Sequence, residues 1–346
     1  MRITRTLAIA VSASLVLIAL LGIFAPWSPS AWYALGAVAL GATSRLAHER
    51  GPRRSLAIVA GVLLAILLCV RVVGSEGGMI RMITLPQRGP SRILARLVDE
   101  QDVALLGARA FALRWPLSPD ERAGLLSAMV EAYADMRRDD VITPSPVADT
   151  LLARQKPEAF DTLVIEPRAT TGPAPKYGVI FLHGYAGSHT LECWLIAKAA
   201  QTVGAVTVCP ATGFSGHWRG EAAEGILRAS LDYLHRRGVQ RVFLAGLSNG
   251  AAGASALAPS FAPSLSGLVL ISGAPAGGGN AGLPTLVVHG NQDAVASITA
   301  AKAFAARTRS TFAGFSGGHF VLLLRREETR KVIADWLLAR LGLHET

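Results

Sequence analysis

Residues 241–250 of the 346-residue chain read RVFLAGLSNG, and these ten residues indicate both a strand and the turn that follows it. The apolar run RVFLA leads into the pentapeptide GLSNG, and a segment rich in alanine and glycine follows. The run predicts a strand that is buried on both faces, and the segment after it is compatible with a helix. A tight strand-to-helix turn strains the serine backbone and lifts the hydroxyl clear of the sheet, so the sequence predicts a nucleophile at Ser248.

Six further apolar runs lie between residue 161 and the carboxyl terminus. They alternate with helix-compatible segments, and this order predicts a doubly wound α/β sheet of mostly parallel strands. Ligands of such sheets bind at the carboxyl ends of the strands, so the residues after each run are candidates for a site. The six predicted strands are DTLVIE (161–166), YGVIFL (177–182), AVTVC (205–209), GLVLIS (267–272), TLVVHG (285–290) and STFAGF (310–315).

Two reactive residues follow the last two predicted strands. Asp293 comes 45 residues after Ser248, and His319 comes 26 residues after Asp293. Each interval is long enough for one helix and one strand, so the three side chains can meet at one edge of the sheet. A serine hydroxyl is a weak nucleophile, and we expect His319 to accept its proton while Asp293 orients the imidazole.

Four ordered motifs make residues 161–342 resemble the α/β-hydrolase family of serine esterases, lipases and peptidases. The resemblance implies an oxyanion hole formed by the backbone N–H groups of Tyr185 and Asn249. It also implies that His183 braces a loop and takes no part in the chemistry. The motifs are HGYAG (183–187), GLSNG (246–250), HGNQD (289–293) and GGH (317–319).

The loop after AVTVC offers side chains for contact with a substrate. We predict substrate-binding roles for Phe214, His217 and Trp218, and packing within the loop is the alternative explanation. No His-x-x-x-His or Cys-x-x-Cys spacing occurs, so we expect neither a metal nor another cofactor. The net charge of +10 comes from scattered arginines and lysines without a dense basic run, and we therefore expect no nucleic-acid partner.

Residues 1–74 predict a membrane region. The first apolar stretch is uncharged for nineteen residues, which make about 28 Å of helix, close to the thickness of a hydrocarbon core. Two weaker stretches follow, and we expect three spans, with one span, two spans or a cleaved signal sequence as alternatives. The predicted spans are 7–25, 31–44 and 56–73.

The arginines predict the orientation of these spans. The loop between the second and third spans contains four of them, which places this loop and the amino terminus on the cytoplasmic side. An odd number of spans then places the rest of the chain in a periplasm or outside the cell. A compartment on that side of the membrane permits disulfides. The sequence spacing of Cys193 and Cys209 does not decide whether they form a disulfide or remain two buried thiols.

Residues 75–160 connect the predicted membrane region to a catalytic domain at 161–346. The glycines and prolines of 75–90 are typical of a linker. Two helices are predicted at 91–115 and 119–138, with Ser118 as the N-cap of the second. This helical pair either braces the catalytic domain or covers its site as a lid, and bracing is the simpler prediction.

These observations together predict a membrane-anchored serine hydrolase. We expect it to cleave carboxylic esters of small-molecule or lipid-like substrates through a Ser-His-Asp triad and an acyl-enzyme intermediate. A peptidase or amidase with the same triad is one alternative, because the sequence does not distinguish the leaving groups. A catalytically inactive hydrolase fold that serves as a membrane scaffold or binding protein is the other. The sequence does not indicate an oligomeric state.

Overall fold

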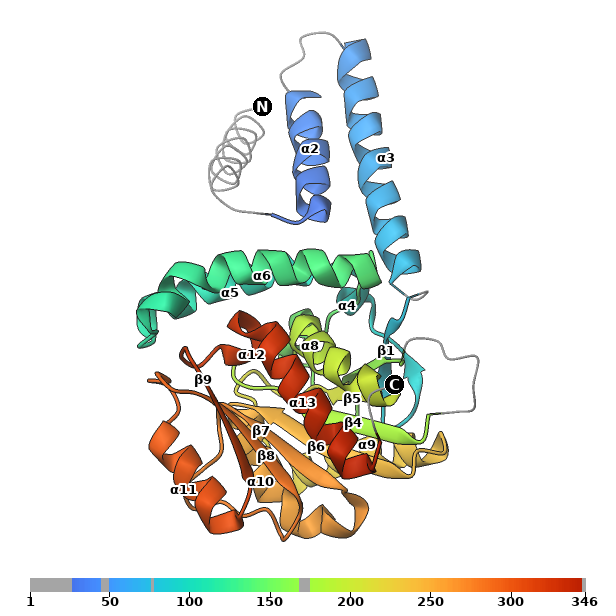
Figure 1. The fold of residues 1–346 in the computed structure, drawn as a ribbon. Helices are drawn as coiled ribbons and strands as arrows, with labels where there is room; N and C mark the ends of the chain where they lie inside the picture. Colours follow the sequence, from blue (N-terminus) through green and yellow to red (C-terminus); the bar gives the residue numbers. More distant parts are fainter. Residues whose placement is uncertain (1–26, 45–49, 76–77, 168–174, 344–346) are drawn as a thin grey trace. The chain divides into compact units, whose positions relative to one another are not determined.

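The computed structural model describes residues 27–44, 50–75, 78–167 and 175–343 (Figure 1). The chain divides into two compact units, Met1–Ser75 and Glu76–Thr346. The predicted span at 7–25 lies outside the described residues. The predicted catalytic domain and the segment that precedes it belong to one unit, the second.

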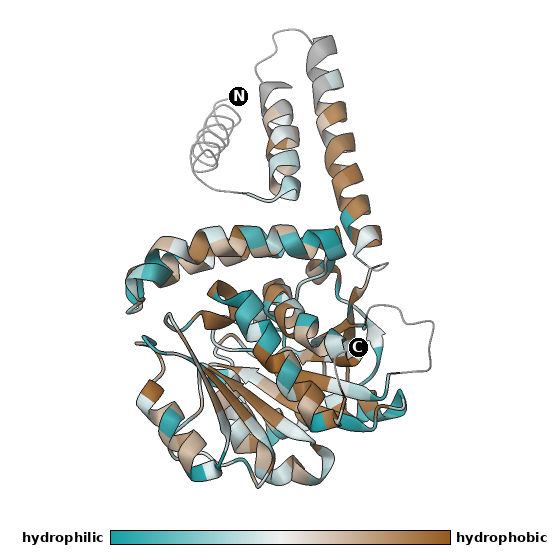
Figure 2. Cartoon of the chain, viewed as in Figure 1, coloured by the Kyte–Doolittle hydropathy of each residue, from teal (hydrophilic) through white to brown (hydrophobic). Residues whose placement is uncertain are grey.

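Two helices make up the described part of the first unit, α2 (Pro29–Ser44) and α3 (Arg50–Gly74). They pack against each other, and Arg71 of α3 donates a hydrogen bond to Ser30 Oγ at 3.2 Å. Among the described residues, only the segment Ala57–Gly74 of α3 is long and apolar enough to cross a membrane. Figure 2 shows this helix as mostly hydrophobic.

A nine-stranded sheet forms the centre of the described part of the second unit. The strand order is β2-β1-β3-β5-β4-β6-β7-β8-β9, and the six strands from β5 to β9 in this order run parallel. The sheet is therefore mostly parallel, as the sequence predicted. The strands are β1 (Ile80–Leu85), β2 (Gly89–Pro90), β3 (Phe160–Ile165), β4 (Tyr177–Leu182), β5 (Val206–Pro210), β6 (Arg241–Leu247), β7 (Gly267–Ile271), β8 (Thr285–Gly290) and β9 (Thr311–Phe315).

Helices cover both faces of the sheet because its central strands are apolar on both sides. Alternate residues of β4 point to opposite faces, so Phe181 joins the core under α8 and α13, while Ile180 joins the core under α9 and α10. The helices of this unit are α4 (Ile93–Leu97), α5 (Glu100–Arg114), α6 (Pro119–Asp139), α7 (Val147–Leu151), α8 (Thr190–Ala200), α9 (Gly220–Arg236), α10 (Asn249–Phe261), α11 (Ile298–Thr308), α12 (Val321–Leu324) and α13 (Arg326–Leu341).

Two expectations from the sequence are corrected at one end of the sheet. The run DTLVIE forms β3, but β3 is antiparallel to β5, whereas a parallel strand was expected. The expected linker at 75–90 contains β1, which pairs antiparallel with β3 along its whole length. The glycines and prolines that suggested a linker only flank this strand, and its ends, Ile80 and Leu85, are fully buried.

The helical pair predicted between residues 91 and 138 is present as α4, α5 and α6. Ser118 is the N-cap of α6, as expected, and accepts a hydrogen bond from the Glu121 amide. The Glu121 carboxylate in turn accepts from the Ser118 amide at 2.9 Å, which completes a capping box. Figure 1 shows α5 and α6 side by side, on the side of the sheet that carries α8 and α12.

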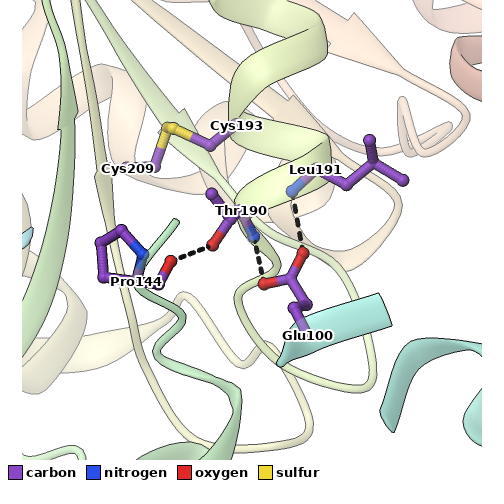
Figure 3. The surroundings of a disulfide bond; sticks show 6 residues. All are labelled: Glu100, Pro144, Thr190, Leu191, Cys193 and Cys209. Atoms are coloured by element: carbon purple, nitrogen blue, oxygen red, sulfur yellow. Dashed lines mark hydrogen bonds between the residues drawn. A yellow bond between two sulfur atoms is a disulfide. The ribbon is translucent and has the colours of Figure 1, made fainter. Parts of the chain in front are cut away.

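Cys193 of α8 and Cys209 of β5 form a disulfide (Figure 3). Helix α8 packs on β5, and this brings the two Cα atoms to 6.0 Å, within the usual range for a disulfide. Of the two arrangements that the sequence left open, the structure has the paired one. Figure 3 also shows the Glu100 carboxylate accepting hydrogen bonds from the amides of Thr190 and Leu191 at the start of α8.

Candidate active site

Ser248 lies at the sharp turn between β6 and α10. Its φ of 54° and ψ of −116° are strained values for a residue with a side chain. The turn needs the two flanking glycines, because a Cβ on Gly246 would lie 2.3 Å from the Gly250 oxygen. A Cβ on Gly250 would lie 2.0 Å from the Leu182 oxygen. The pentapeptide GLSNG therefore forms the turn that the sequence predicted.

The structure brings the three predicted catalytic side chains together at the carboxyl ends of the strands. Asp293 follows β8 and His319 follows β9. His319 Nε2 lies 3.0 Å from Ser248 Oγ, and His319 Nδ1 lies 2.9 Å from Asp293 Oδ2. Both distances are within hydrogen-bond range, and they allow proton transfer from the hydroxyl to the imidazole.

Asp293 is buried and held by its own loop. Its Oδ1 atom accepts hydrogen bonds from the amides of Val295 at 2.9 Å and Ala296 at 2.8 Å. Burial raises the pKa of this carboxyl, but the hydrogen bond and charge of His319 and the two amides outweigh burial, so the pKa is lowered overall. Asp293 is therefore an anion near neutral pH and favours His319 with its proton on Nδ1.

His289, at the end of β8, is a second histidine beside Asp293, and the sequence analysis gave it no role. Its Nε2 atom lies 3.1 Å from the Ala296 oxygen and 3.3 Å from Asp293 Oδ2. Burial lowers the pKa of His289, so its imidazole is neutral. Its position in the motif HGNQD is the signal that could have identified it. We assign it to holding the Asp293 loop in place.

The loop that contains Tyr185 lies directly against the nucleophile turn. A Cβ on Gly184 would lie 3.2 Å from the Leu247 oxygen and 3.2 Å from Ser248 Cβ. The amide of Ala186 donates to the Phe214 oxygen at 2.9 Å, which holds the loop from its other side. Asn249, the first residue of α10, donates through Nδ2 to the Ser215 oxygen at 2.8 Å. Asn249 thus follows Ser248 directly in the chain, and the loop that contains Tyr185 packs against the Ser248 turn. These are the two residues expected to supply the oxyanion donors.

His183 holds the loops on either side of it. Its Nε2 accepts a hydrogen bond from the Thr212 amide at 3.0 Å, and its Nδ1 lies 2.8 Å from the Gly184 oxygen. Burial lowers the pKa of His183 to about 4, so the imidazole is neutral and donates through Nδ1. This hydrogen-bonding agrees with the loop-bracing role that the resemblance implied.

The three predicted substrate-binding residues differ in the structure. The prediction for Trp218 is wrong, because this side chain is 1% exposed, packs on Gly253 of α10 and donates to the His183 oxygen at 2.9 Å. Phe214 is exposed, with its ring 5.0 Å from that of Tyr185. His217 is also exposed, and in the described part of the chain no hydrogen bond joins it to the triad.

The helical pair also reaches the site, through residues that the sequence analysis did not single out. The rings of Phe111 and Trp115 at the end of α5 lie 6.5 Å and 6.0 Å from the ring of Tyr185. Glu121 of α6 accepts a hydrogen bond from the amide of Phe320, the residue after His319. The available signal was the pair of aromatic residues four positions apart, which places them on one face of a helix. Among the described residues, no cluster of three or more metal-ligating side chains is present.

No protein-family model and no curated protein matches this chain, whereas many solved structures do. Est1E from Butyrivibrio proteoclasticus is 16% identical, with a TM-score of 0.46 over 53% of this chain and 95% of that one. A serine hydrolase without a lid from Xanthomonas campestris is 19% identical, with a TM-score of 0.44 over 56% and 93% of the two chains. The fluorophosphonate-binding serine hydrolase FphF from Staphylococcus aureus is 14% identical, with a TM-score of 0.42 over 52% and 93%.

Proposed function

We propose that this chain is a serine hydrolase that cleaves carboxylic esters. The observation that carries the proposal is the continuous series of hydrogen bonds from Ser248 through His319 to Asp293, which begins at a strained strand-to-helix turn. An inert serine at such a turn would not need an imidazole at 3.0 Å that is itself oriented by a buried carboxylate.

The proposed reaction follows from this geometry. Ser248 Oγ attacks the ester carbonyl carbon while His319 Nε2 takes the hydroxyl proton, and the carbonyl oxygen becomes an oxyanion. The amides of Tyr185 and Asn249 would donate to that oxyanion. The carbon–oxygen bond to the alcohol then breaks, and His319 returns the proton to the leaving oxygen. Water then attacks the carbonyl carbon of the acyl-enzyme while His319 takes its proton. The bond to Ser248 Oγ breaks, His319 returns the proton to this oxygen, and the carboxylic acid is released.

We expect the purified protein to hydrolyse p-nitrophenyl esters and to leave peptide p-nitroanilides uncut. The alcohol of an ester is a better leaving group than an amine, and the proposed site needs no further acid to expel it. The measurement is the release of p-nitrophenol or p-nitroaniline, compared as kcat/KM at equal enzyme concentration. Comparable kcat/KM values for the two substrate classes would favour the amidase alternative.

We also propose that the hydrolase unit is anchored in a membrane and lies on its non-cytoplasmic side. The apolar segment Ala57–Gly74 of α3 supports a span, and we retain 7–25 and 31–44 as further proposed spans. The four arginines between residues 45 and 54, three of which lie within α3, support a cytoplasmic location for this stretch. The disulfide between Cys193 and Cys209 supports an oxidising compartment for the unit that follows.

Reporter fusions test this topology. We expect alkaline phosphatase to be active when fused after residue 80 and inactive when fused after residue 50, because the enzyme requires an oxidising compartment. Phosphatase activity is measured in whole cells and normalised to the amount of fusion protein on an immunoblot. The opposite pattern would place the hydrolase unit in the cytoplasm.

A further inference from the structure

The helical pair α5–α6 is fixed to the hydrolase unit where α5 begins. Glu100 is 3% exposed, and its carboxylate accepts hydrogen bonds from the amides of Thr190 at 2.6 Å and Leu191 at 2.9 Å. It also accepts from the hydroxyls of Tyr133, in α6, and Ser145. A carboxylate at the amino terminus of α8 satisfies amides that have no partner within the helix. The start of α5 is therefore anchored beside the loop that contains Tyr185.

Helix α6 is fixed at both of its ends. At its start, Glu121 is 1% exposed, and its Oε1 accepts from the Phe320 amide at 2.8 Å. At its end, Asp139 Oδ2 accepts from Trp194 Nε1 at 2.9 Å and from Lys198 Nζ at 3.0 Å, both in α8. Buried, charge-assisted contacts of this kind do not suit a segment that opens and closes. The helical pair is a fixed part of the hydrolase unit.

Five aromatic rings lie between the end of α5 and the two loops that flank the triad. Their contacts form a continuous series, which we call the aromatic wall. Phe111 stacks on Trp115 with ring centroids 4.5 Å apart, and it meets Phe320 at 5.8 Å. Tyr185 lies 6.0 Å from Trp115 and 5.0 Å from Phe214. These separations are typical of interacting aromatic pairs.

The aromatic wall is in contact with the reacting groups at two points. The ring of Phe320 lies 5.6 Å from the imidazole of His319. Tyr185 is the residue whose amide is proposed to bind the oxyanion, and its loop packs against Ser248. A substrate that places its carbonyl carbon at Ser248 Oγ therefore has the wall beside it. None of the five side chains carries a charge.

Part of this apolar surface is open to solvent although the rings contact one another. Tyr185 is 44% exposed and Phe214 is 40% exposed. Exposed aromatic surface next to a nucleophile is the usual form of a site that binds an apolar ligand, because binding removes that surface from water.

We propose that Phe111 of α5 and Trp115, the residue directly after this helix, form an apolar subsite together with Tyr185, Phe214 and Phe320, and that this subsite selects esters with a bulky hydrocarbon group. This inference rests on the proposed function and adds a substrate class to it. A helical segment that lies between β2 and β3 in the chain supplies one side of the subsite. Since that segment is fixed, the subsite is formed before the substrate arrives.

A substrate series tests the subsite. We expect the double variant Phe111→Ala/Trp115→Ala to lower kcat/KM for p-nitrophenyl octanoate by about tenfold or more, and that for p-nitrophenyl acetate by less than about twofold, since differences of several methylenes in an apolar pocket have at least this effect. Octyl acetate and ethyl acetate form the second pair, and they show whether the subsite takes the acyl or the alcohol group. A selective loss in either pair supports the proposal.

Two further variants control for folding and for the helix itself. Leu113→Ala changes an apolar residue of α5 that is 88% exposed and makes none of the ring contacts, so both members of each pair should react as in the parent. Trp115→Phe keeps a ring, and we expect it to retain most of the octanoate activity of the parent protein. Circular dichroism at increasing temperature compares the fold of all variants.

Equal losses for short and long esters in the double variant would overturn the subsite, because the rings would then only hold the Tyr185 loop. Equal kcat/KM values for the long and the short ester within both pairs in the parent protein would overturn it as well. In both cases the hydrolysis of acetate by the parent protein still supports the proposed function. Absence of hydrolysis of every ester by the parent protein would overturn both proposals.

Discussion

Replacing Ser248 by alanine is expected to abolish ester hydrolysis and to prevent covalent labelling by a fluorophosphonate. The hydroxyl oxygen is the atom that forms the acyl-enzyme in the proposed reaction, and the imidazole that would activate it lies 3.0 Å away. Loss of the nucleophile in serine-protease triads lowers kcat by about 10⁶-fold, and we expect an effect of that order here.

The measurement combines p-nitrophenyl acetate turnover with gel fluorescence after treatment with a fluorescent fluorophosphonate. His319→Ala should lose turnover too, because without the base the hydroxyl keeps its proton. Ser260→Ala is the matched control, since Ser260 is an exposed serine near the other end of α10. It should be labelled like the parent protein and turn over ester at the same rate.

The fold should survive the Ser248→Ala change. The substitution removes one oxygen and keeps the Cβ, so the strained φ of the turn is unchanged and no new clash arises. Persistent labelling of Ser248→Ala would show that the reactive serine lies elsewhere. Absence of labelling in the parent protein as well would favour the alternative of an inactive scaffold with a hydrolase fold.

The sheet and the three residues at its edge could be predicted because their signals are local. Apolar runs of five or six residues mark strands, and seven of them occur from residue 161 onward. Burial on both faces was expected for all seven, but the last run forms β9, which is partly exposed at the edge of the sheet. The residues that follow the strand ends can then be located without knowing any contact. For this reason Ser248, Asp293 and His319 were found together, although 71 residues separate the first from the last.

The role of the helical pair could not be predicted, because it depends on contacts between residues far apart in the sequence. Glu121 and Phe320 are 199 positions apart, and nothing near either residue indicates the other. Strand β1 was missed for a similar reason, since its short apolar pattern acquires meaning only when it pairs with β3. Its flanking glycines and prolines suggested a linker.

Trp218 shows a second limit of prediction from the sequence. A loop with a phenylalanine, a histidine and a tryptophan has the same sequence whether a side chain faces a substrate or the core. The difference arises from Gly253 in α10, where the missing Cβ leaves room for the tryptophan to pack. Phe214 and His217 of the same loop are exposed, whereas Trp218 is buried.

Asp293→Asn is expected to lower kcat by about 10⁴-fold, the size of the loss known for the equivalent change in a serine-protease triad. In this structure the reason can be followed atom by atom. Oδ1 accepts hydrogen bonds from the amides of Val295 and Ala296, so an asparagine would keep its carbonyl oxygen there. Its amide group would then face His319 Nδ1 and donate to it.

That reversal moves the imidazole proton to the wrong nitrogen. With Nδ1 accepting, the neutral His319 carries its proton on Nε2, and Nε2 can no longer accept the proton of Ser248 Oγ. The loss should therefore fall on kcat and on the rate of fluorophosphonate labelling, while the side-chain volume and the two amide hydrogen bonds are kept. Stopped-flow or initial-rate measurements with p-nitrophenyl acetate give the value.

Asp232→Asn is the matched control, because it makes the same chemical change at an exposed position of α9 and should leave kcat unaltered. A loss of less than about tenfold in Asp293→Asn would mean that the carboxylate does not set the imidazole tautomer, since the tautomer mechanism has a far larger effect. His289 would not explain such a result. Its Nε2 lies 3.3 Å from the same Asp293 Oδ2 that His319 faces, but this nitrogen can only donate while it hydrogen-bonds to the Ala296 oxygen, so it cannot take the proton of Ser248. The variant thus separates a catalytic role of Asp293 from a purely structural one.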